Sequence, residues 1–359
     1  MFEKNASDLI LTEGQPPVLR QVGDLTAVEG KKLSSEDVRR LTLGLMSEEQ
    51  AKAFEQDWEL DTSFGIENVA RFRLNIFQQR GKMGAVIRML PFQIPTLESL
   101  GVPEIVKRWL MIPHGIIIVT GPTGSGKSTS QAAMIGYLNQ HRPYHVVTIE
   151  DPVEFVHPHG TCTVEQREVG HDTKSFDEAL RRVFRQSPDV IMIGEMRDRE
   201  TFETALELAE TGHLVLATLH TGDASQAISR IIDVFPSDQH QQIRVQLSLS
   251  LIGVIVQQLV PRLDGKGRLL SVEVLEANSA VRNLIRKNEL QQIYSVIQTS
   301  SSEGMATMNS TLLRLFHESK ISLEQAMLFT TRPQELEQLV ARLPKARARI
   351  RPPQEVLQR

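Results

Sequence analysis

The chain has 359 residues, which is more than one compact domain usually holds, so its length predicts two units that each bury a core. Hydrophobic residues make up 40% of the sequence and charged residues 23%, a composition that excludes disordered chains, collagen-like repeats and membrane bundles. The net charge of −4 gives no overall attraction to nucleic acid. The single cysteine, Cys162, excludes an internal disulfide and a four-cysteine zinc site, and it indicates a reducing compartment.

No apolar run reaches the roughly 18 residues that cross a bilayer. The longest candidate, residues 245–260, is interrupted by serines and glutamines. The N-terminal sequence MFEKNASDLI lacks the pattern of a signal peptide. We therefore expect a cytoplasmic protein without direct membrane insertion, whose contact with a membrane runs through a partner.

Residues 1–90 predict a small α+β domain. Short apolar runs between Pro and Gly turns indicate strands at its start, and a Ser-Ser-Glu-Asp sequence opens a helix expected from Ser34 to about Gln56. The alternation in ARFRLNIFQ places Arg73 on the polar face of a strand. The next run, GAVIRML, contains Arg88 and predicts the partner strand.

Three prolines in residues 91–103 predict a linker to a second domain at 104–340, and a basic tail follows at 341–359. In the second domain, apolar runs alternate with amphipathic helices, which predicts an α/β fold with a parallel sheet covered on both faces. The expected strands are GIIIVTG, VVTIED, DVIMIGE and HLVLATLH, and helices are expected from about Lys127, from Ser175, from about Arg199 and from about 280 onward.

A P-loop pattern follows the first of these strands and opens a helix. Its glycines let the backbone approach phosphate closely, so that successive N–H groups face the anion. In such a loop Lys127 reaches the outer phosphates and the Ser128 hydroxyl ligates Mg²⁺. The sequence therefore predicts a site for ATP with Mg²⁺, against the alternative of a Gly-rich turn. The predicted nucleotide-binding residues are Gly121, Pro122, Thr123, Gly124, Ser125, Gly126, Lys127, Ser128 and Thr129.

Two acidic clusters each follow a predicted strand. VVTIEDPVEF contains Glu150, Asp151 and Glu154, and DVIMIGEMRD contains Glu195. Phosphoryl transfer to water needs one carboxylate to activate the water and another to hold Mg²⁺ or its waters. A solvated loop is the alternative for each cluster, but in a P-loop domain the carboxyl ends of the strands converge on the nucleotide.

His213 and His220 stand at the two ends of the last predicted strand. His220 is at the ligand end, where it could donate to a γ-phosphate oxygen. His213 is at the opposite end, where the residue pattern favours a structural role.

Together these segments resemble the secretion ATPase superfamily, and within it the PilT-like type IV pilus retraction ATPases. The resemblance covers nearly the whole chain and rests on ASDLILTEGQPPVLR, GPTGSGKST, TIEDPVEFVH, PDVIMIGEMRD and TGHLVLATLHTGDA. AVRNLIRK at 280–287 is similar to the AIRNLIRE segment associated with retraction ATPases, with Val281 for Ile and Lys287 for Glu. The resemblance implies a PAS-like N-terminal domain joined to a RecA-like P-loop ATPase core, assembled as a ring hexamer.

Carried over residue by residue, the resemblance implies that Glu154 is the general base and that Glu195 is the Walker B acid at the metal. It also implies that His213 and His220 form a histidine pair at the nucleotide.

The resemblance further matches Arg73 and Arg88 to arginines that approach the γ-phosphate at a site between domains or subunits. A fixed guanidinium group suits phosphate. A solvated strand face is the alternative for these arginines.

The implied function is a Mg²⁺-dependent ATPase motor in the cytoplasm at the inner membrane. It powers pilus retraction and twitching motility through an inner-membrane platform protein. An accessory retraction ATPase that works with a paralogous pilus ATPase is an alternative. Pilus-extension and type II secretion motors are disfavoured, because they typically carry a longer N-terminal region and a tetracysteine zinc element. A nucleic-acid motor is disfavoured by the near-neutral charge, and a nucleotide switch without motion by the intact acids.

Overall fold

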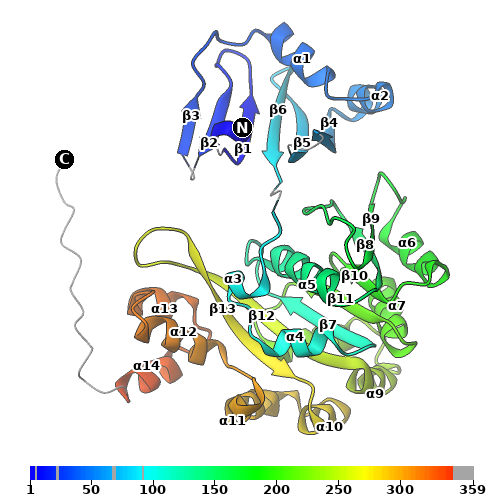
Figure 1. Ribbon diagram of the computed structural model, residues 1–359, viewed down its shortest axis with the longest axis vertical. Helices are drawn as coiled ribbons and strands as arrows, with labels where there is room; N and C mark the ends of the chain where they lie inside the picture. Colours follow the sequence, from blue (N-terminus) through cyan, green and yellow to red (C-terminus); the bar gives the residue numbers. More distant parts are fainter. Residues whose placement is uncertain (5, 22–23, 67–69, 91–92, 343–359) are drawn as a thin grey trace.

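Two sheets organise the chain (Figure 1). In Figure 1 the N-terminal sheet lies at the top, and the chain that leaves β6 runs down from it to the domain that contains the larger sheet. The predicted basic tail lies outside the described residues from 343 onward. The structure is a computed structural model that describes residues 1–4, 6–21, 24–66, 70–90 and 93–342.

The N-terminal sheet is antiparallel, with the strand order β3-β2-β1-β6-β5-β4. One face is apolar and packs against the helices through residues such as Phe72 and Leu74. The predicted pairing of the two arginine-bearing strands is confirmed, since Arg73 lies directly opposite Arg88. The strands are β1 Asp8–Leu11, β2 Val18–Gln21, β3 Asp24–Ala27, β4 Glu59–Ile66, β5 Ala70–Gln79 and β6 Lys82–Met89.

The single helix expected after Ser34 is two helices in the structure. The first ends at Leu43, with Gly44 as its C-cap. The Ser47 side chain then accepts from the Gln50 N–H while the Gln50 side chain accepts from the Ser47 N–H, and this capping box starts a new helix. The apolar repeat continues across the break, which is why the sequence pattern suggests one helix. The bounds are α1 Ser35–Leu43 and α2 Glu48–Asp57.

The stretch 91–103 was expected to be a linker without regular structure, but it contains the short helix α3, Leu97–Leu100. The Thr96 side chain caps its start, and Gly101, with a φ of 75°, ends it. Leu97 is buried with the core of the larger sheet. Part of the expected linker is therefore packed on the second domain.

The larger sheet has the order β13-β12-β7-β11-β10-β8-β9. Its strands pair in parallel from β12 to β9, and β13 is antiparallel at the edge. The four predicted strands are confirmed as β7, β8, β10 and β11, whereas the sequence patterns do not predict β9, β12 or β13. The bounds are β7 Gly115–Thr120, β8 His145–Glu150, β9 Thr163–Glu168, β10 Val190–Ile193, β11 Leu214–Leu219, β12 Leu251–Pro261 and β13 Arg268–Glu276.

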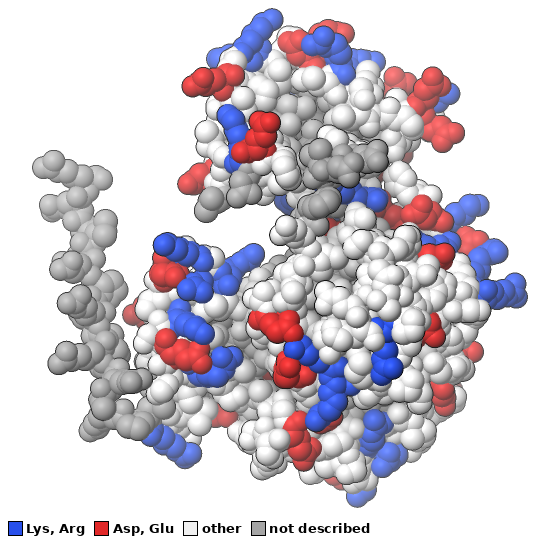
Figure 2. Space-filling view, viewed as in Figure 1, with Lys and Arg blue, Asp and Glu red and all other residues white. Residues whose placement is uncertain are grey.

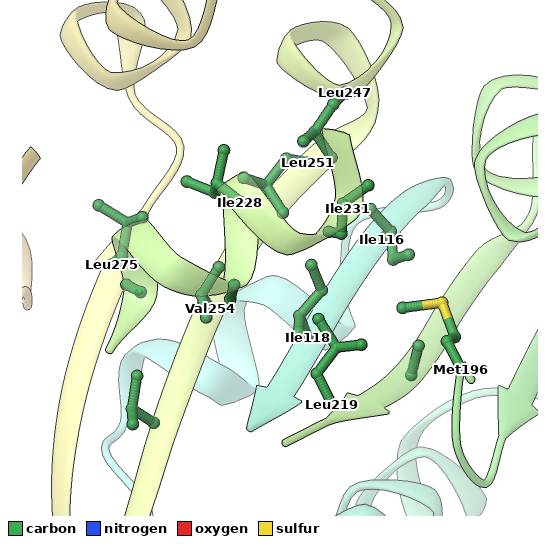
Figure 3. Packing of buried hydrophobic residues seen from close by; sticks show 14 of the residues in the cluster. Ile116, Ile118, Met196, Leu219, Ile228, Ile231, Leu247, Leu251, Val254 and Leu275 are labelled. Carbon is green, nitrogen blue, oxygen red and sulfur yellow. The ribbon is translucent and has the colours of Figure 1, made fainter. Parts of the chain in front are cut away.

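Helices cover both faces of this sheet, as predicted. Helices α4 and α5 pack on the face that carries Ile117. On the other face, Figure 3 shows Ile228 and Ile231 of α8 in one apolar cluster with Ile118 of β7 and Val254 of β12. The bounds are α4 Ile105–Leu110, α5 Lys127–His141, α6 Phe176–Val183, α7 Arg199–Glu210, α8 Ala224–Asp233 and α9 His240–Ser250.

The chain after β13 is helical, as predicted. Arg282 of α10 donates to the carbonyl oxygens of Leu249 and Leu251 at 2.8 and 3.0 Å, so that α10 closes the end of α9. Within the described residues, no helix is both long and apolar enough to span a membrane. The bounds are α10 Ser279–Lys287, α11 Ile293–Thr299, α12 Met308–His317, α13 Leu323–Phe329 and α14 Pro333–Ala341.

Gly253 of β12 lies against the ring of Trp109, a fully buried residue of α4. A Cβ atom on Gly253 would come within 2.4 Å of that ring. Gly253→Ala is therefore expected to lower the unfolding free energy by about 1–3 kcal/mol, because the packed ring has no room to shift. Thermal denaturation followed by circular dichroism measures the change in Tm.

Gly136→Ala is the matched control, because a Cβ there would make an ordinary 3.6 Å contact with Ile94. This control is expected to keep or raise the Tm, since alanine favours a helix more than glycine does. An unchanged Tm in Gly253→Ala would contradict the packing described here.

Candidate functional site

The P-loop connects β7 to α5, as the sequence predicts. Gly121 has a φ of 142°, and Gly126, at the N-cap of α5, has a φ of 91°. Glycine adopts both conformations without strain. A Cβ atom on Gly121 would also lie 2.3 Å from the carbonyl oxygen of Gln257, so the loop is seated against β12. A loop of this shape presents the free N–H groups of the first helical turn, which is an arrangement that binds phosphate.

Lys127 is held at the loop by backbone oxygens. Its Nζ donates to the carbonyl oxygens of Gly121 and Pro122 at 2.9 and 3.1 Å, and it lies 3.4 Å from Nδ1 of His220. Burial lowers the pKa of Lys127, while two nearby carboxylates act to raise it. A partly buried ammonium group attracts phosphate more strongly than an exposed one, because less water screens its charge.

Glu195 and His220 come together at the carboxyl ends of β10 and β11. Glu195 Oε1 lies 3.0 Å from His220 Nε2, and Arg197 Nε and Nη2 each lie 2.8 Å from Glu195 Oε2. The hydrogen bond to Glu195 raises the pKa of Arg197. Because the ammonium group of Lys127 has only donors, His220 Nδ1 is the acceptor and Nε2 carries the proton donated to Glu195.

Glu150 and Glu154 follow the same strand but lie in different surroundings. Glu150 is 6% exposed and accepts from Thr148 Oγ1 at 2.6 Å and from Gln166 Nε2 at 3.1 Å. Burial raises the pKa of Glu150, and this carboxyl also accepts from the Glu154 backbone N–H. Glu154 itself is exposed and lines a cavity. Glu150 therefore fixes the loop, and of these two glutamates Glu154 is the one that water can reach.

A cavity of about 530 Å³ brings most of the predicted site together. Of the predicted residues in its lining, Arg73 belongs to the N-terminal sheet and the rest belong to the larger domain, so both domains line it. Gly121, Pro122 and Ser125 are not in the lining. The predicted residues that line the cavity are Arg73, Thr123, Gly124, Gly126, Lys127, Ser128, Thr129, Glu154, Glu195 and His220.

The structure separates the two predicted arginines. Arg73 lines the cavity. Arg88, directly opposite on β6, donates from Nε to Asp8 Oδ1 at 2.8 Å. Asp8 is 4% exposed. Within this chain Arg88 therefore belongs to an ion pair of the N-terminal sheet and not to the cavity.

His213 does not line the cavity of this chain. It precedes β11, at the end opposite His220, so about 20 Å of backbone separates the two residues. Its Nδ1 lies 3.1 Å from the carbonyl oxygen of Leu208, and its ring makes an edge contact with Phe184 at 5.9 Å between centroids. These contacts agree with the structural role that the residue pattern favours, and the assignment of His213 to nucleotide binding stays a prediction.

Three basic residues of the cavity lining have no role assigned from the sequence. Arg197, His157 and Arg268 all line the cavity. Burial lowers the pKa of His157 to about 4, so its ring is neutral near pH 7. Arg197 carried a signal, because it lies two residues after Glu195 in an acidic cluster. Arg268 carried none, because its strand, β13, is not predicted.

The chain after His220 is fixed by β13. Glu273 of that strand accepts from the Ala224 N–H, at the start of α8, at 2.9 Å. The same carboxyl accepts from the Met308 N–H at the start of α12. Glu273 is 4% exposed, and burial raises its pKa.

Ser128 and Glu195 are the predicted Mg²⁺ partners, and both line the cavity. Among the described residues, no group of three or more His, Cys, Asp or Glu side chains could hold a metal ion. One hydroxyl and one carboxylate fit Mg²⁺, which keeps several waters and takes further oxygens from phosphates.

Residues 52–268 match a family model described as type II/IV secretion system protein. The matched range includes the P-loop and both acidic clusters.

Two similar proteins come from Pseudomonas aeruginosa. The type IV pilus ATPase PilU is 45% identical over 327 residues, which are 91% of this chain and 86% of PilU. The type IV pilus retraction ATPase PilT is 47% identical over 324 residues, which are 90% of this chain and 94% of PilT. A crystal structure of the pilus retraction motor PilT with bound ADP has a TM-score of 0.89 and 49% identity, covering 94% of this chain and 96% of that chain.

Glu154→Gln is expected to bind nucleotide almost as tightly as the wild type and to lose turnover on the order of 10²- to 10⁴-fold, because an amide cannot accept the proton of water. A coupled ATPase assay measures kcat, and titration with a fluorescent ATP analogue measures Kd. The matched control is Glu203→Gln, an exposed residue of α7. Retained turnover in Glu154→Gln would refute its assignment as the base.

Arg73→Ala is expected to bind ATP but to hydrolyse it roughly 10³- to 10⁵-fold more slowly, as when an arginine that stabilises the transition state is removed. Arg88→Ala is the comparison, since it removes the shorter ion pair of the buried Asp8, leaving Arg20 at 3.7 Å, and is expected to lower the Tm. Near-normal turnover in Arg73→Ala would rule out its role. Lost turnover at an unchanged Tm in Arg88→Ala would instead assign that arginine to a nucleotide.

Proposed function

The chain belongs to the type II/IV secretion system protein family and is an ATPase, and we propose that it uses ATP hydrolysis to retract type IV pili. The observation that carries the proposal is the shared cavity, in which Arg73 of one domain joins the P-loop of the other. A site completed by a second domain couples hydrolysis to relative motion of the two domains. Similarity to a pilus retraction motor over 94% of the chain supports retraction as the work performed.

In the proposed reaction each group at the larger domain has one task. Lys127 binds the β- and γ-phosphates. Ser128 and Glu195 hold Mg²⁺ and its waters, and the ion, when bound, neutralises charge on the phosphates. Glu154 takes the proton of the attacking water. His220, which donates to Glu195, senses the γ-phosphate and links it to the metal site.

Closure of the N-terminal domain is the proposed mechanical step. The stretch 91–103 joins the domains, so a change there moves Arg73 relative to the P-loop. We place six subunits in a ring in the cytoplasm, against an inner-membrane platform protein of the pilus. Successive closures around the ring would then displace the platform and remove pilin subunits from the pilus base.

An accessory retraction ATPase is the second candidate. The chain is 45% identical to PilU and 47% identical to PilT, a difference too small to choose between them. In α10, Val281 is buried and Lys287 is exposed in the last turn. Valine in place of isoleucine keeps the packing, whereas lysine in place of glutamate reverses a surface charge that a partner could meet. In this role the chain would act together with a paralogous pilus ATPase.

We expect no nucleic-acid partner. Figure 2 shows Lys and Arg interspersed with Asp and Glu over the described residues of the visible face. Binding to nucleic acid relies on positive charge that is clustered on one face or along a groove. Stimulation of ATP turnover by DNA or RNA would overturn this expectation.

Expression of this chain is expected to restore twitching in a type IV piliated bacterium that lacks its retraction ATPase. The measurement is the diameter of twitching zones, and Glu154→Gln serves as the inactive control. Restoration only in a strain that also has a paralogous pilus ATPase would assign the accessory role. If the purified protein hydrolyses ATP but neither strain twitches, the retraction proposal is wrong.

A further inference from the structure

The two domains also meet outside the cavity. Arg71 of β5 and Glu168 at the end of β9 form an ion pair, with 3.1 Å between Nη2 and Oε2. The same Nη2 donates to Ser63 Oγ of β4 at 2.8 Å, and the Ser63 hydroxyl donates to Glu168 Oε1 at 3.3 Å. The Glu168 side chain is only 4% exposed. Two side chains of the N-terminal sheet thus converge on one buried carboxylate of the ATPase domain.

Glu168 also holds the loop that carries Glu154. Its Oε2 accepts from the Val153 backbone N–H at 3.0 Å. Val153 is buried and directly precedes Glu154. The oxygen that meets Arg71 is therefore the one that fixes the loop of the proposed base.

The position of Arg71 on β5 is linked to that of Arg73, which is two residues further along the same strand. Residues two apart on a strand share one face, so both arginines project from the same side of β5. The other side, with Phe72 and Leu74, is buried in the N-terminal core. A fixed Arg71 therefore determines where Arg73 enters the cavity.

We infer that Arg71 and Glu168 are positioning residues for ATP hydrolysis, whose ion pair holds Arg73 and Glu154 at the cavity together when the domains are closed. Neither Arg71 nor Glu168 lines the cavity, so they act through their neighbours. The inference rests on the proposed roles of Arg73 and Glu154. It adds a physical link through which Arg73 and Glu154 reach their positions at the cavity together.

Hydrogen exchange tests this link without using turnover. In Arg71→Ala the buried Glu168 loses its cation, and an uncompensated carboxylate turns toward water. We expect exchange to become about fivefold to tenfold faster in a peptide spanning 151–156, which contains the Val153 amide. Protection of β8 should stay unchanged. Arg71→Lys should restore protection, because its ammonium group can pair with the same carboxylate.

The matched control is Arg182→Ala, which removes an exposed ion pair with Glu178 on α6. This control is expected to leave both exchange in 151–156 and turnover unchanged. If the loss of any arginine were enough to speed exchange in 151–156, Arg182→Ala would show the change as well. An effect that is specific to the contact between the domains appears only in Arg71→Ala.

Kinetics supply the second readout. Arg71→Ala and Glu168→Gln are each expected to lower kcat about tenfold and to change KM for ATP by less than about twofold, because the geometry of the reacting groups changes more than nucleotide binding. The double variant should be no slower than the slower single variant, since the two residues act as one unit. Arg71→Lys should recover most of the lost kcat.

Unchanged exchange in 151–156 for a folded Arg71→Ala would overturn the inference. Losses of kcat that multiply in the double variant would also overturn it, because independent residues have additive effects on free energy. If Arg71→Ala does not fold, exchange in Glu168→Gln decides, since that variant keeps an acceptor for Val153 but loses the charge. Failure of the proposed roles is distinct: Glu154→Gln or Arg73→Ala would keep turnover while exchange still responded to Arg71→Ala.

Discussion

The parallel pairing of β7, β11, β10 and β8 is the constraint from which the site follows. In a parallel sheet the carboxyl ends of the strands lie along one edge, so residues that follow different strands become neighbours. Lys127, Glu154, Glu195 and His220 meet for this reason, although they are far apart in sequence. Helices on both faces exclude water from the sheet, and parallel sheets occur almost only where both faces are covered in this way.

The N-terminal sheet completes the site with polar contacts. Its apolar face packs against its own helices, and its polar face meets the ATPase domain through Arg71 and Ser63 at Glu168. From the helix-covered face, Thr62 Oγ1 adds a polar contact of 3.3 Å with His171 Nε2. Contacts of this kind break and form again more easily than a large apolar interface does. An apolar core within the domain and polar contacts at its surface therefore suit a domain that is rigid internally but moves as a unit.

The sequence predicted the parts of the site that depend on local pattern, such as the P-loop and the strands that continuous apolar runs mark. It did not predict β9, because TVEQRE is largely polar and lies at the edge of the sheet. Only the pairing with β8 identifies this segment as a strand. It also missed β12, because α9 passes into that strand at Leu251 without a turn residue. The role of Glu168 could not be read from sequence at all, since it depends on two distant segments meeting at one carboxylate. The position of His213, at the end of β11 opposite His220, was predicted from the strand pattern, because residues seven apart lie at opposite ends of a six-residue strand.

The contacts of Glu273 show that the ATPase fold extends beyond the range of the family match. This buried carboxylate accepts from the first amides of both α8 and α12, so the positive ends of two helices share one negative charge. The family match stops at residue 268, before Glu273 is reached. A fragment trimmed to that boundary would leave the start of α8, and with it the His220 loop, without its buried acceptor. The C-terminal helices are therefore part of the ATPase fold itself, and any shortened version of the chain made for biophysical work has to extend past the start of α12.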